Sequence, residues 1–384
     1  MNGHEEIAKR MLCLALMLCL FTVCIPHAFA AQKYEYKGSY LRDAVEKPLR
    51  SSMGLAYSIL GIDMVNSETF TGGKHPMLKN VMKAILLLIA LLLLAFLVPS
   101  GAILPAAFAQ EAAQLPKLEP VELSGDIAPL PLEGNAPYAP QESGYGADGL
   151  SYHDDSLDIR IYKTRAYDTP VFVAYVQIAD ASQLRTEQAK AYPSPAMART
   201  DVMAKRVGAV IACNADYFIF HRSGIVYRKG ELLRDRPNEE FDALAIDENG
   251  DFHMIAPLTA EGFAAIGSKI VTSFCFGPAL VIDGEIHEDV GRDVTYKQRM
   301  GIAQVGKLSY MLVATDGPEE KDSVGLSIPQ FSQLMKDLGA IHAYNLDGGS
   351  STCMMFHGAK VNGQKAGKVR SIGDIVYFAT AVAP

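Results

Sequence analysis

From residue 157 onward, apolar and polar residues fall into short runs that predict a domain rich in strands. β-branched and aromatic residues fill 158–162 and 170–178, and the apolar run 207–213 is typical of a buried strand. The sequence Asp247-Glu-Asn-Gly250 favours a hairpin between the strands on either side of it. The remaining predicted strands are 241–246, 252–255, 279–282, 308–314, 341–346, 353–356, 360–361 and 375–379.

Helical patterns are fewer than strand patterns. Residues 195–206 predict one helix, and a clearer one begins at Ser327, which forms a capping-box pattern with Gln330. Gly339 is placed to end that helix. We therefore expect an α+β fold, with mixed β-sheets flanked by a few helices in a single domain over 151–384. The apolar stripe of the second helix consists of Phe331, Leu334, Met335 and Leu338.

The first 109 residues contain two hydrophobic segments, 11–31 and 84–109. Each has a basic flank, a leucine-rich run and a small-x-small site, which is the pattern of a signal peptide. Each apolar run is short for a membrane-spanning helix, which needs about 20 apolar residues. Two interpretations stay open: Met77 is the true start of the protein, or the segments form a two-helix anchor joined by a loop.

The charges around the second hydrophobic segment predict its orientation. Basic residues precede the segment and acidic residues follow it, so the positive-inside tendency places the rest of the chain outside the cytoplasm. We expect an extracytoplasmic protein that is membrane-anchored or secreted, with the membrane as a partner of the N-terminal segments. Residues 110–150 are rich in proline and predict an extended linker, with a loop wrapped on the domain as the alternative.

Composition excludes several classes of function. The formal net charge is -8 and there is no basic block, so nucleic-acid binding is not expected. The sequence contains no GxSxG, GxxxxGK[ST] or HExxH motif, and its histidines show no metal-ligand spacing. The absence of a CxxC motif leaves buried free thiols as the expected state of Cys213, Cys275 and Cys353.

Three predicted strands end in acidic or amide side chains. The turns are Asn214-Ala-Asp216, Asp316-Gly317 and Asn345-Leu-Asp347-Gly-Gly. Paired glycines allow backbone N–H groups to approach an anion, and hydroxyl side chains add donors. Arginines near strand-like segments suit a phosphate, because the planar guanidinium binds two oxygens at once. The pattern predicts a polar pocket for a sugar and a phosphate, with Arg299 and Arg370 as phosphate ligands.

The run Asn345-Leu-Asp-Gly-Gly-Ser-Ser-Thr352 resembles the NLDGGxST-like segment of the phosphodiester glycosidase family. Further similar segments follow the family's order: Asn214-Ala-Asp-Tyr-Phe218, Gln298-Arg299-Met-Gly-Ile302, Asp316-Gly317 and Arg370. The resemblance spans roughly residues 157–382. There are also departures: Ala215 and Asp216 replace two glycines, Pro318 replaces an arginine, and Asp374 stands where asparagine is usual.

The resemblance implies hydrolysis of a carbohydrate phosphodiester at the sugar's anomeric carbon. Because a phosphodiester is already a good leaving group, we ourselves infer one dominant catalytic carboxylate, Asp347, with Asp216 as the second one. No cofactor is required, although a divalent cation stays open. Two other functions stay open as well: a polysaccharide-binding or envelope-assembly module, and a metal-dependent phosphodiesterase. The candidate substrate-binding residues are Asn214, Arg299, Asp316, Asn345, Gly348, Gly349, Ser350, Ser351, Thr352 and Arg370.

Overall fold

The computed structural model describes residues 120–123, 127–290, 293–363 and 369–383. The predicted hydrophobic segments 11–31 and 84–109 lie outside these residues. Among the residues described, no helix is long and apolar enough to cross a membrane.

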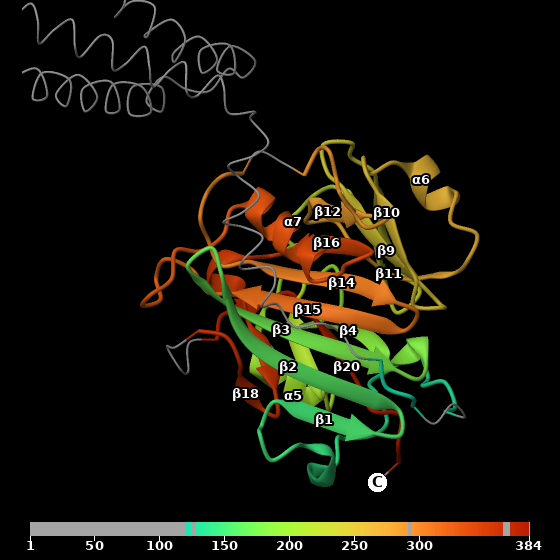
Figure 1. Ribbon diagram of the computed structural model, residues 1–384. Helices are drawn as coiled ribbons and strands as arrows, with labels where there is room; N and C mark the ends of the chain where they lie inside the picture. The colour runs from blue at the N-terminus through green and yellow to red at the C-terminus, as the bar shows by residue number, and fades with distance from the viewer. Residues whose placement is uncertain (1–119, 124–126, 291–292, 364–368, 384) are drawn as a thin grey trace, which may run out of the picture. The chain divides into compact units, whose positions relative to one another are not determined.

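A large antiparallel sheet of eight strands forms the centre of the domain (Figure 1). Its order is β1-β2-β3-β15-β14-β16-β12-β13. In the first half of β2 every second residue is apolar and buried in the core, namely Leu157, Ile159 and Ile161. β15 and β3 lie in the middle and are buried on both faces, which explains their continuous apolar runs. The strands are Ser151–Asp154 (β1), Leu157–Ala166 (β2), Thr169–Ile178 (β3), Ala279–Ile282 (β12), Glu285–Ile286 (β13), Met300–Gly306 (β14), Ser309–Thr315 (β15) and His342–Leu346 (β16).

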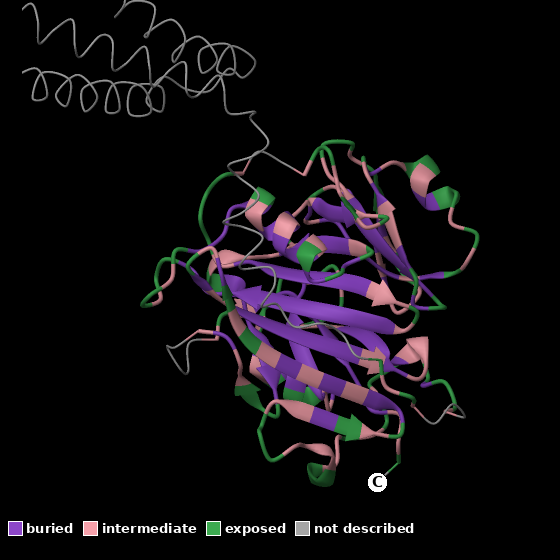
Figure 2. Cartoon of the chain, in the orientation of Figure 1, coloured by how far each residue is buried: buried purple, intermediate pink, exposed green. Residues whose placement is uncertain are grey.

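A second antiparallel sheet of five strands packs against one face of the first. Its order is β18-β17-β6-β20-β4. Side chains of both sheets share the main hydrophobic core, for example Leu312 of the large sheet and Val376 of the smaller one. Figure 2 shows that the central strands of the large sheet are buried along most of their length. The strands of the second sheet are Leu184–Gln188 (β4), Ile211–Asn214 (β6), Met354–Phe356 (β17), Ala359–Lys360 (β18) and Asp374–Phe378 (β20).

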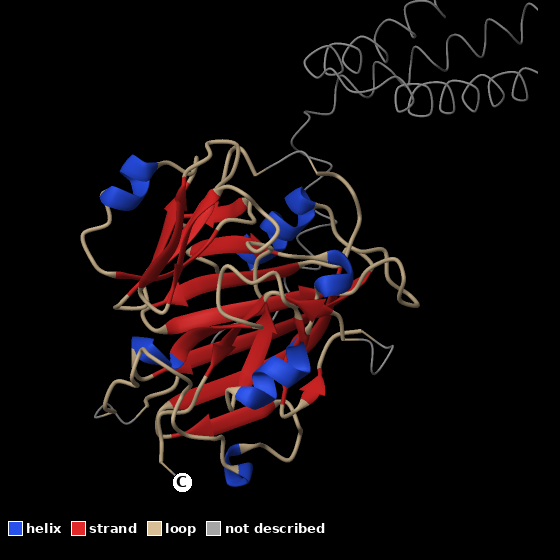
Figure 3. Cartoon of the chain, turned by 180° about the vertical axis from the view of Figure 1, so that it is seen from behind, coloured by secondary structure: helices blue, strands red, loops and turns tan. Residues whose placement is uncertain are grey.

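One helix covers the outer face of the eight-stranded sheet and another covers the outer face of the five-stranded sheet, as Figures 1 and 3 show from opposite sides. α7 (Ile328–Asp337) packs its apolar stripe on the eight-stranded sheet, and Phe331 is fully buried there. Ser327 caps this helix in a complete capping box with Gln330. α5 (Thr200–Arg206) packs on the five-stranded sheet through Met203. The domain therefore has two sheets between two helices.

A smaller lobe is built on the sheet β10-β9-β11. The hairpin of β7 and β8 and the short helix α6 contribute to its core. A separate pair, β19-β5, joins the segment before β20 to the segment before α5. The elements are Gly224–Arg228 (β7), Glu231–Arg236 (β8), Ala243–Asp247 (β9), Phe252–Ile255 (β10), Ala260–Ala264 (α6), Ile270–Phe274 (β11), Ala198–Arg199 (β5) and Ser371–Ile372 (β19), with 3-10 turns at Glu142–Gly144 (η1), Ala181–Gln183 (η2) and Gly349–Ser351 (η3).

The structure confirms the predicted α+β class, the hairpin of β9 and β10, and the capped helix α7. The predicted helix 195–206 is wrong at its start, because the helix begins only at Thr200. Ala198 and Arg199 are extended instead and pair with β19. Pairing with a strand that is distant in the sequence therefore decides the conformation of these two residues. The local pattern of apolar residues contains no information about that pairing.

The proline-rich residues described within 110–150 contact the domain. Leu130 is buried, and its backbone N–H donates to the Ser182 hydroxyl at 2.7 Å. Arg185 donates to the Pro131 carbonyl oxygen at 2.9 Å and to the Gly134 carbonyl oxygen at 3.2 Å. Arg185 therefore holds residues 131–134 on the domain by binding their backbone carbonyl oxygens.

The cysteines of the domain are free and buried, as predicted for Cys213, Cys275 and Cys353. Burial raises the pKa of the Cys275 thiol to about 12 and that of Cys353 to about 11. These thiols are therefore protonated at neutral pH and unsuited to act as nucleophiles.

Candidate active site

The candidate site lies where the ends of β6 and β16 come together, one strand from each large sheet. The backbone N–H of Asp347, which follows β16, donates to the Ala215 carbonyl oxygen at 3.1 Å. The buried Asn214 side chain completes this junction: Nδ2 donates to the Asp347 carbonyl oxygen at 2.6 Å, and Oδ1 accepts the Cys353 N–H at 3.0 Å. Asn214 thus holds three backbone segments together, which explains an amide at this position.

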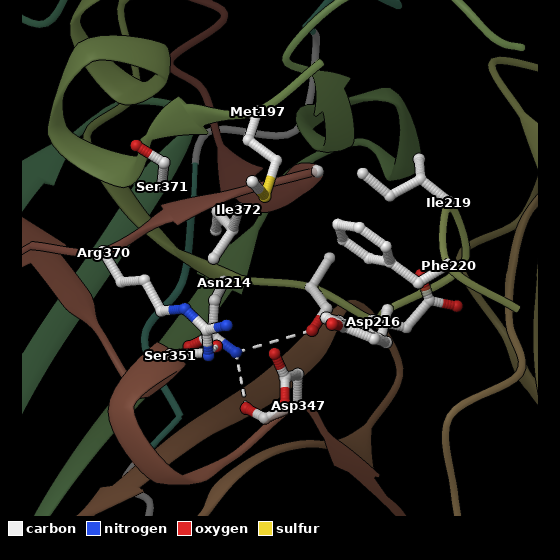
Figure 4. Close-up of a pocket in the computed structure, with 13 residues that line it drawn as sticks. Met197, Asn214, Asp216, Ile219, Phe220, Asp347, Ser351, Arg370, Ser371 and Ile372 are labelled. Carbon is white, nitrogen blue, oxygen red and sulfur yellow. Dashed lines mark hydrogen bonds between the residues drawn. The ribbon is translucent and has the colours of Figure 1, made fainter. Parts of the chain in front are cut away.

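A narrow pocket opens at this junction (Figure 4). Its enclosed free volume is about 10 Å³, which is room for roughly one water molecule. The pocket brings together residues from four separate segments of the sequence: Met197, 214–220, 347–351 and 370–373. Of the residues predicted for the site, those that line it are Asn214, Asp216, Asp347, Ser351 and Arg370.

Asp347 is the half-buried carboxylate of this pocket. Burial raises the pKa of its side chain, and the negative charge of Asp216 also raises it. A hydrogen bond from Ser351 and the positive charge of Arg370 act in the opposite direction. A carboxylate with a raised pKa binds a proton more readily, so Asp347 is suited to act as a base or a nucleophile.

The turn after Asp347 is shaped by its two glycines. A Cβ atom on Gly348 would lie 2.7 Å from the Gln298 carbonyl oxygen, so no other residue fits without a shift of backbone. Gly349 has a φ of 58°, which favours glycine, and its N–H donates to the same oxygen at 2.9 Å. The turn then directs the hydroxyls of Ser350 and Ser351 toward Arg370.

Arg370 is exposed at the mouth of the pocket. Its Nη1 donates to Ser350 Oγ at 3.2 Å and to Ser351 Oγ at 3.0 Å. Within the described part of the chain, no carboxylate lies within 4.0 Å of its guanidinium to form an ion pair with it. A positive group fixed by neutral hydroxyls beside a pocket is suited to bind an anionic ligand.

Behind the pocket lies a buried cluster of Asp216, Arg228 and Asp374. The side chain of Asp216 is only 1% exposed and that of Asp374 is 0% exposed. Arg228 Nη2 lies 3.0 Å from Asp216 Oδ1 and 2.7 Å from Asp374 Oδ2. Its guanidinium also packs over the rings of Phe218 and Phe274, at 4.6 and 5.1 Å from their centroids.

The oxygens of Asp216 are bonded to groups of the protein. Besides Arg228, Oδ1 accepts the Phe218 N–H at 3.3 Å, and Oδ2 accepts the Cys275 N–H at 2.9 Å. Its carboxylate is thus fixed and is more buried than that of Asp347. The Asp216 side chain also holds the turn that carries Phe218.

In this cluster, Asp374 has a carboxylate oxygen whose hydrogen-bonding capacity is unsatisfied within the part of the chain that the structure describes. Its Oδ1 is buried and has no hydrogen-bond partner among the described residues. Burial is the main cause that raises the pKa of Asp374; Arg228 lowers this pKa, and Asp216 and Asp347 raise it. With one arginine between two carboxylates, protonation of Asp374 relieves the cost of an unpaired buried charge.

Several predicted site residues lie outside the pocket. Arg299 is buried and donates to the carbonyl oxygens of Leu326 at 2.8 Å and Thr295 at 2.6 Å, so its guanidinium is held by its own neighbourhood. Asp316 accepts the Gly363 N–H at 2.8 Å. The Asn345 side chain donates to the Gly277 carbonyl oxygen at 2.7 Å, and the Thr352 hydroxyl is buried. The structure does not bring Arg299, Asp316, Asn345 or Thr352 to the pocket wall.

The sequence interpretation missed the remaining members of this site. Arg228 gives no local signal, because its partners Asp216 and Asp374 are 12 and 146 positions away. Asp374 was visible only as a departure from the family pattern. The apolar wall was also missed, because isolated apolar residues in loops carry no periodicity. That wall consists of Met197, Tyr217, Ile219, Phe220 and Ile372.

A metal centre would need several ligands close together. Among the residues that the structure describes, there is no group of three or more His, Cys, Asp or Glu side chains placed to hold a metal ion. Two carboxylates line the pocket, Asp216 and Asp347, and Asp347 is the more exposed of the two.

Comparison with protein families finds one match, which covers part of the domain. The family model described as "Phosphodiester glycosidase" matches residues 207–379. The match includes the pocket segments that carry Asn214, Asp216, Asp347 and Arg370, whereas Met197 precedes it. No curated protein sequence matches the chain.

Three solved structures from different organisms match part of this chain. One is the catalytic domain of zebrafish N-acetylglucosamine-1-phosphodiester alpha-N-acetylglucosaminidase, auto-inhibited by its pro-peptide, with 18% identity and a TM-score of 0.48; the match covers 60% of this chain and 86% of that one. A hypothetical protein from Synechocystis matches with 15% identity and a TM-score of 0.42, covering 58% of this chain and 62% of that one. A putative exported protein from Burkholderia pseudomallei has 15% identity and a TM-score of 0.39, with 55% and 74% covered.

Proposed function

We propose that this chain hydrolyses a sugar-1-phosphodiester at the anomeric C–O bond, because residues 207–379 match the family model described as "Phosphodiester glycosidase". The observation that carries this proposal is the pairing of two groups in one pocket: the half-buried carboxylate of Asp347 and the exposed guanidinium of Arg370. The Asp347 carboxylate can react at the anomeric carbon, which becomes positively charged in the transition state. The Arg370 guanidinium can bind the phosphate. The substrate is a carbohydrate phosphodiester of a glycan or an envelope polymer.

In the proposed reaction, Arg370 binds the phosphate and Asp347 lies beside the anomeric carbon. Water attacks this carbon and gives a proton to Asp347, or Asp347 attacks first and water then hydrolyses the glycosyl ester. In both cases the anomeric C–O bond breaks and its electron pair stays on the phosphate oxygen. A phosphate monoester is a good leaving group, so a second carboxylic acid to protonate it is unnecessary. Asp216 then supports the reaction through its charge.

Hydrolysis in oxygen-18 water tests this proposal. A panel of hexose 1-(methyl phosphates) would be incubated with the full chain, and the products analysed by mass spectrometry. We expect the label in the sugar, since water oxygen becomes the anomeric hydroxyl group. Label in the phosphate would instead support a metal-dependent phosphodiesterase. Saturable binding without turnover would support a polysaccharide-binding or envelope-assembly module.

We also propose that the domain acts outside the cytoplasm, anchored or released by the N-terminal hydrophobic segments. The support is the basic-before and acidic-after charge pattern around 84–109. A reporter enzyme that is active only after export, fused behind Pro384, is expected to be active in the native host. Removal of residues 1–109 should abolish that activity. Full activity of the truncated fusion, or activity of a cytoplasmic reporter alone, would contradict the proposal.

A further inference from the structure

Opposite Arg370, the pocket has an apolar wall that the proposed hydrolysis does not use. In the view of Figure 4, Phe220 and Ile219 lie across the pocket from Arg370, and Met197 lies between the two sides. Phe220 is 43% exposed and Met197 is 50% exposed. Large apolar side chains that gather at a pocket are more informative than single exposed ones, because apolar lining with a few polar groups is typical of ligand sites.

The ring of Phe220 is held in place by a neighbouring aromatic ring, that of Tyr217. It stacks on Tyr217, with a centroid distance of 4.3 Å and an interplanar angle of 25°. Its backbone N–H donates to the Tyr217 carbonyl oxygen at 3.0 Å. Arg234 fixes the rest of the loop by donating to the carbonyl oxygens of Phe218 and His221. The wall is therefore built on a supported turn.

The same loop packs closely against Gly373, which lies between β19 and β20. A Cβ atom on Gly373 would lie 2.8 Å from Cδ1 of Ile219, so glycine is what allows the loop to approach. Met197 has an unbranched, flexible side chain that can move aside, whereas the stacked ring of Phe220 is stiff. A ligand that enters the narrow pocket therefore displaces Met197 and meets the ring.

We infer that Phe220, supported by Tyr217, is the platform on which the sugar ring of the substrate stacks. This inference rests on the proposed function and adds the orientation of the substrate. Arg370 binds the phosphate, Asp347 lies beside the anomeric carbon, and the sugar extends from that carbon toward Phe220. A pyranose presents an apolar face of C–H groups, which matches an aromatic ring. The protein has no tryptophan, so this role falls to phenylalanine or tyrosine.

The opposite orientation would place the aglycone on Phe220. The positions of the charged groups argue against it. Asp347 must lie at the anomeric carbon and Arg370 at the phosphate, so the aglycone extends beyond Arg370, away from the apolar wall. The sugar is the part of the substrate that remains on the Phe220 side of Asp347 (Figure 4).

The test replaces the ring while keeping its apolar character. For Phe220→Leu we expect KM for a hexose 1-(methyl phosphate) to rise about tenfold, the scale of one aromatic contact, with kcat nearly unchanged. The factor should be the same for a hexose 1-(benzyl phosphate), because the sugar is shared. Phe220→Trp should retain the wild-type KM. Leu232→Ala, which truncates a side chain of similar exposure outside the pocket, should have no effect.

Inhibition by inorganic phosphate separates the two ends of the pocket. Arg370→Lys should weaken this inhibition, because lysine lacks the planar fork, and Phe220→Leu should leave it unchanged. An effect of Phe220→Leu on the benzyl ester alone would assign the ring to the aglycone and overturn the inference, as would no effect on either ester.

A readout without turnover keeps the inference separate from the proposed function. Saturation-transfer NMR on the wild type should show transfer from saturated aromatic protons to the sugar ring protons of a hexose 1-phosphate, and Phe220→Leu should weaken this transfer strongly. Aromatic transfer of wild-type strength in Phe220→Leu would overturn the inference even if no ester is hydrolysed. If the wild type shows the saturation transfer but hydrolyses none of the esters, that result would instead count against the proposed function.

Discussion

Asp347→Asn is expected to reduce kcat by at least about 100-fold, the lower scale for loss of an acid or base group. Asparagine keeps the size of the side chain, and its amide oxygen can still accept a hydrogen bond from Ser351. It cannot take a proton from water or attack the anomeric carbon. The backbone contacts that hold this turn, from Asn214 and to Ala215, do not involve the carboxylate. The measurement is steady-state hydrolysis of a sugar-1-phosphodiester, together with the melting temperature.

Asp316→Asn is the matched control for that substitution. Asp316 also follows a strand of the large sheet and is buried, but it lies outside the pocket. Its Oδ1 accepts the Gly363 N–H, and asparagine can accept the same bond. We expect turnover close to that of the wild type. If Asp347→Asn retained near-wild-type turnover while melting normally, the assignment of Asp347 would have to be abandoned.

Arg228→Met is expected to lower the free energy of unfolding by about 3–5 kcal/mol, the cost of removing one partner from a buried ion pair. Methionine fills much of the same space between Phe218 and Phe274 but leaves two buried carboxylates without their cation. Denaturant unfolding of the domain measures this loss.

Two further variants decide whether unpaired buried charge is the cause of the stability loss in Arg228→Met. Neutralising Asp216 and Asp374 to asparagine in the Arg228→Met protein should recover part of the lost stability, because the unpaired charges disappear. Arg206→Met removes a more exposed arginine from its pair with Glu187, at 2.9 Å, and should cost less than about 1 kcal/mol. Equal losses for Arg206→Met and Arg228→Met would show that burial of the pair is not what matters.

The sequence predicted the local elements well where the signal was local. The hairpin of β9 and β10 follows from a turn sequence between apolar runs, and α7 follows from its cap and its stripe. The helix before residue 200 failed because pairing with β19 overrides a helical pattern. Among the candidate site residues, Asn214, Asp347 and Arg370 line one pocket, and their roles stay predictions.

Tertiary contacts decided the rest of the site. Arg299 has the same chemistry as Arg370, yet its guanidinium is bound by nearby carbonyl oxygens and does not reach the pocket. Asp216 looks like a free acid in the sequence, but Arg228 fixes it from within the fold. Spacing along the chain states which groups are present. It does not state which of them are already bonded.

The sequence by itself determined the fold class, the capped helix and the acidic turn that ends β16, because caps, turns and periodicity depend on neighbours within a few residues. Only the tertiary structure decided that Asp347 faces open space, that Asp216 and Asp374 share one arginine, and that Phe220 lies opposite Arg370. These relations depend on burial and on contacts between distant strands. Burial is a property of the packed sheets, since a carboxylate exchanges water for an arginine only when the chain has brought both into the same dry interior.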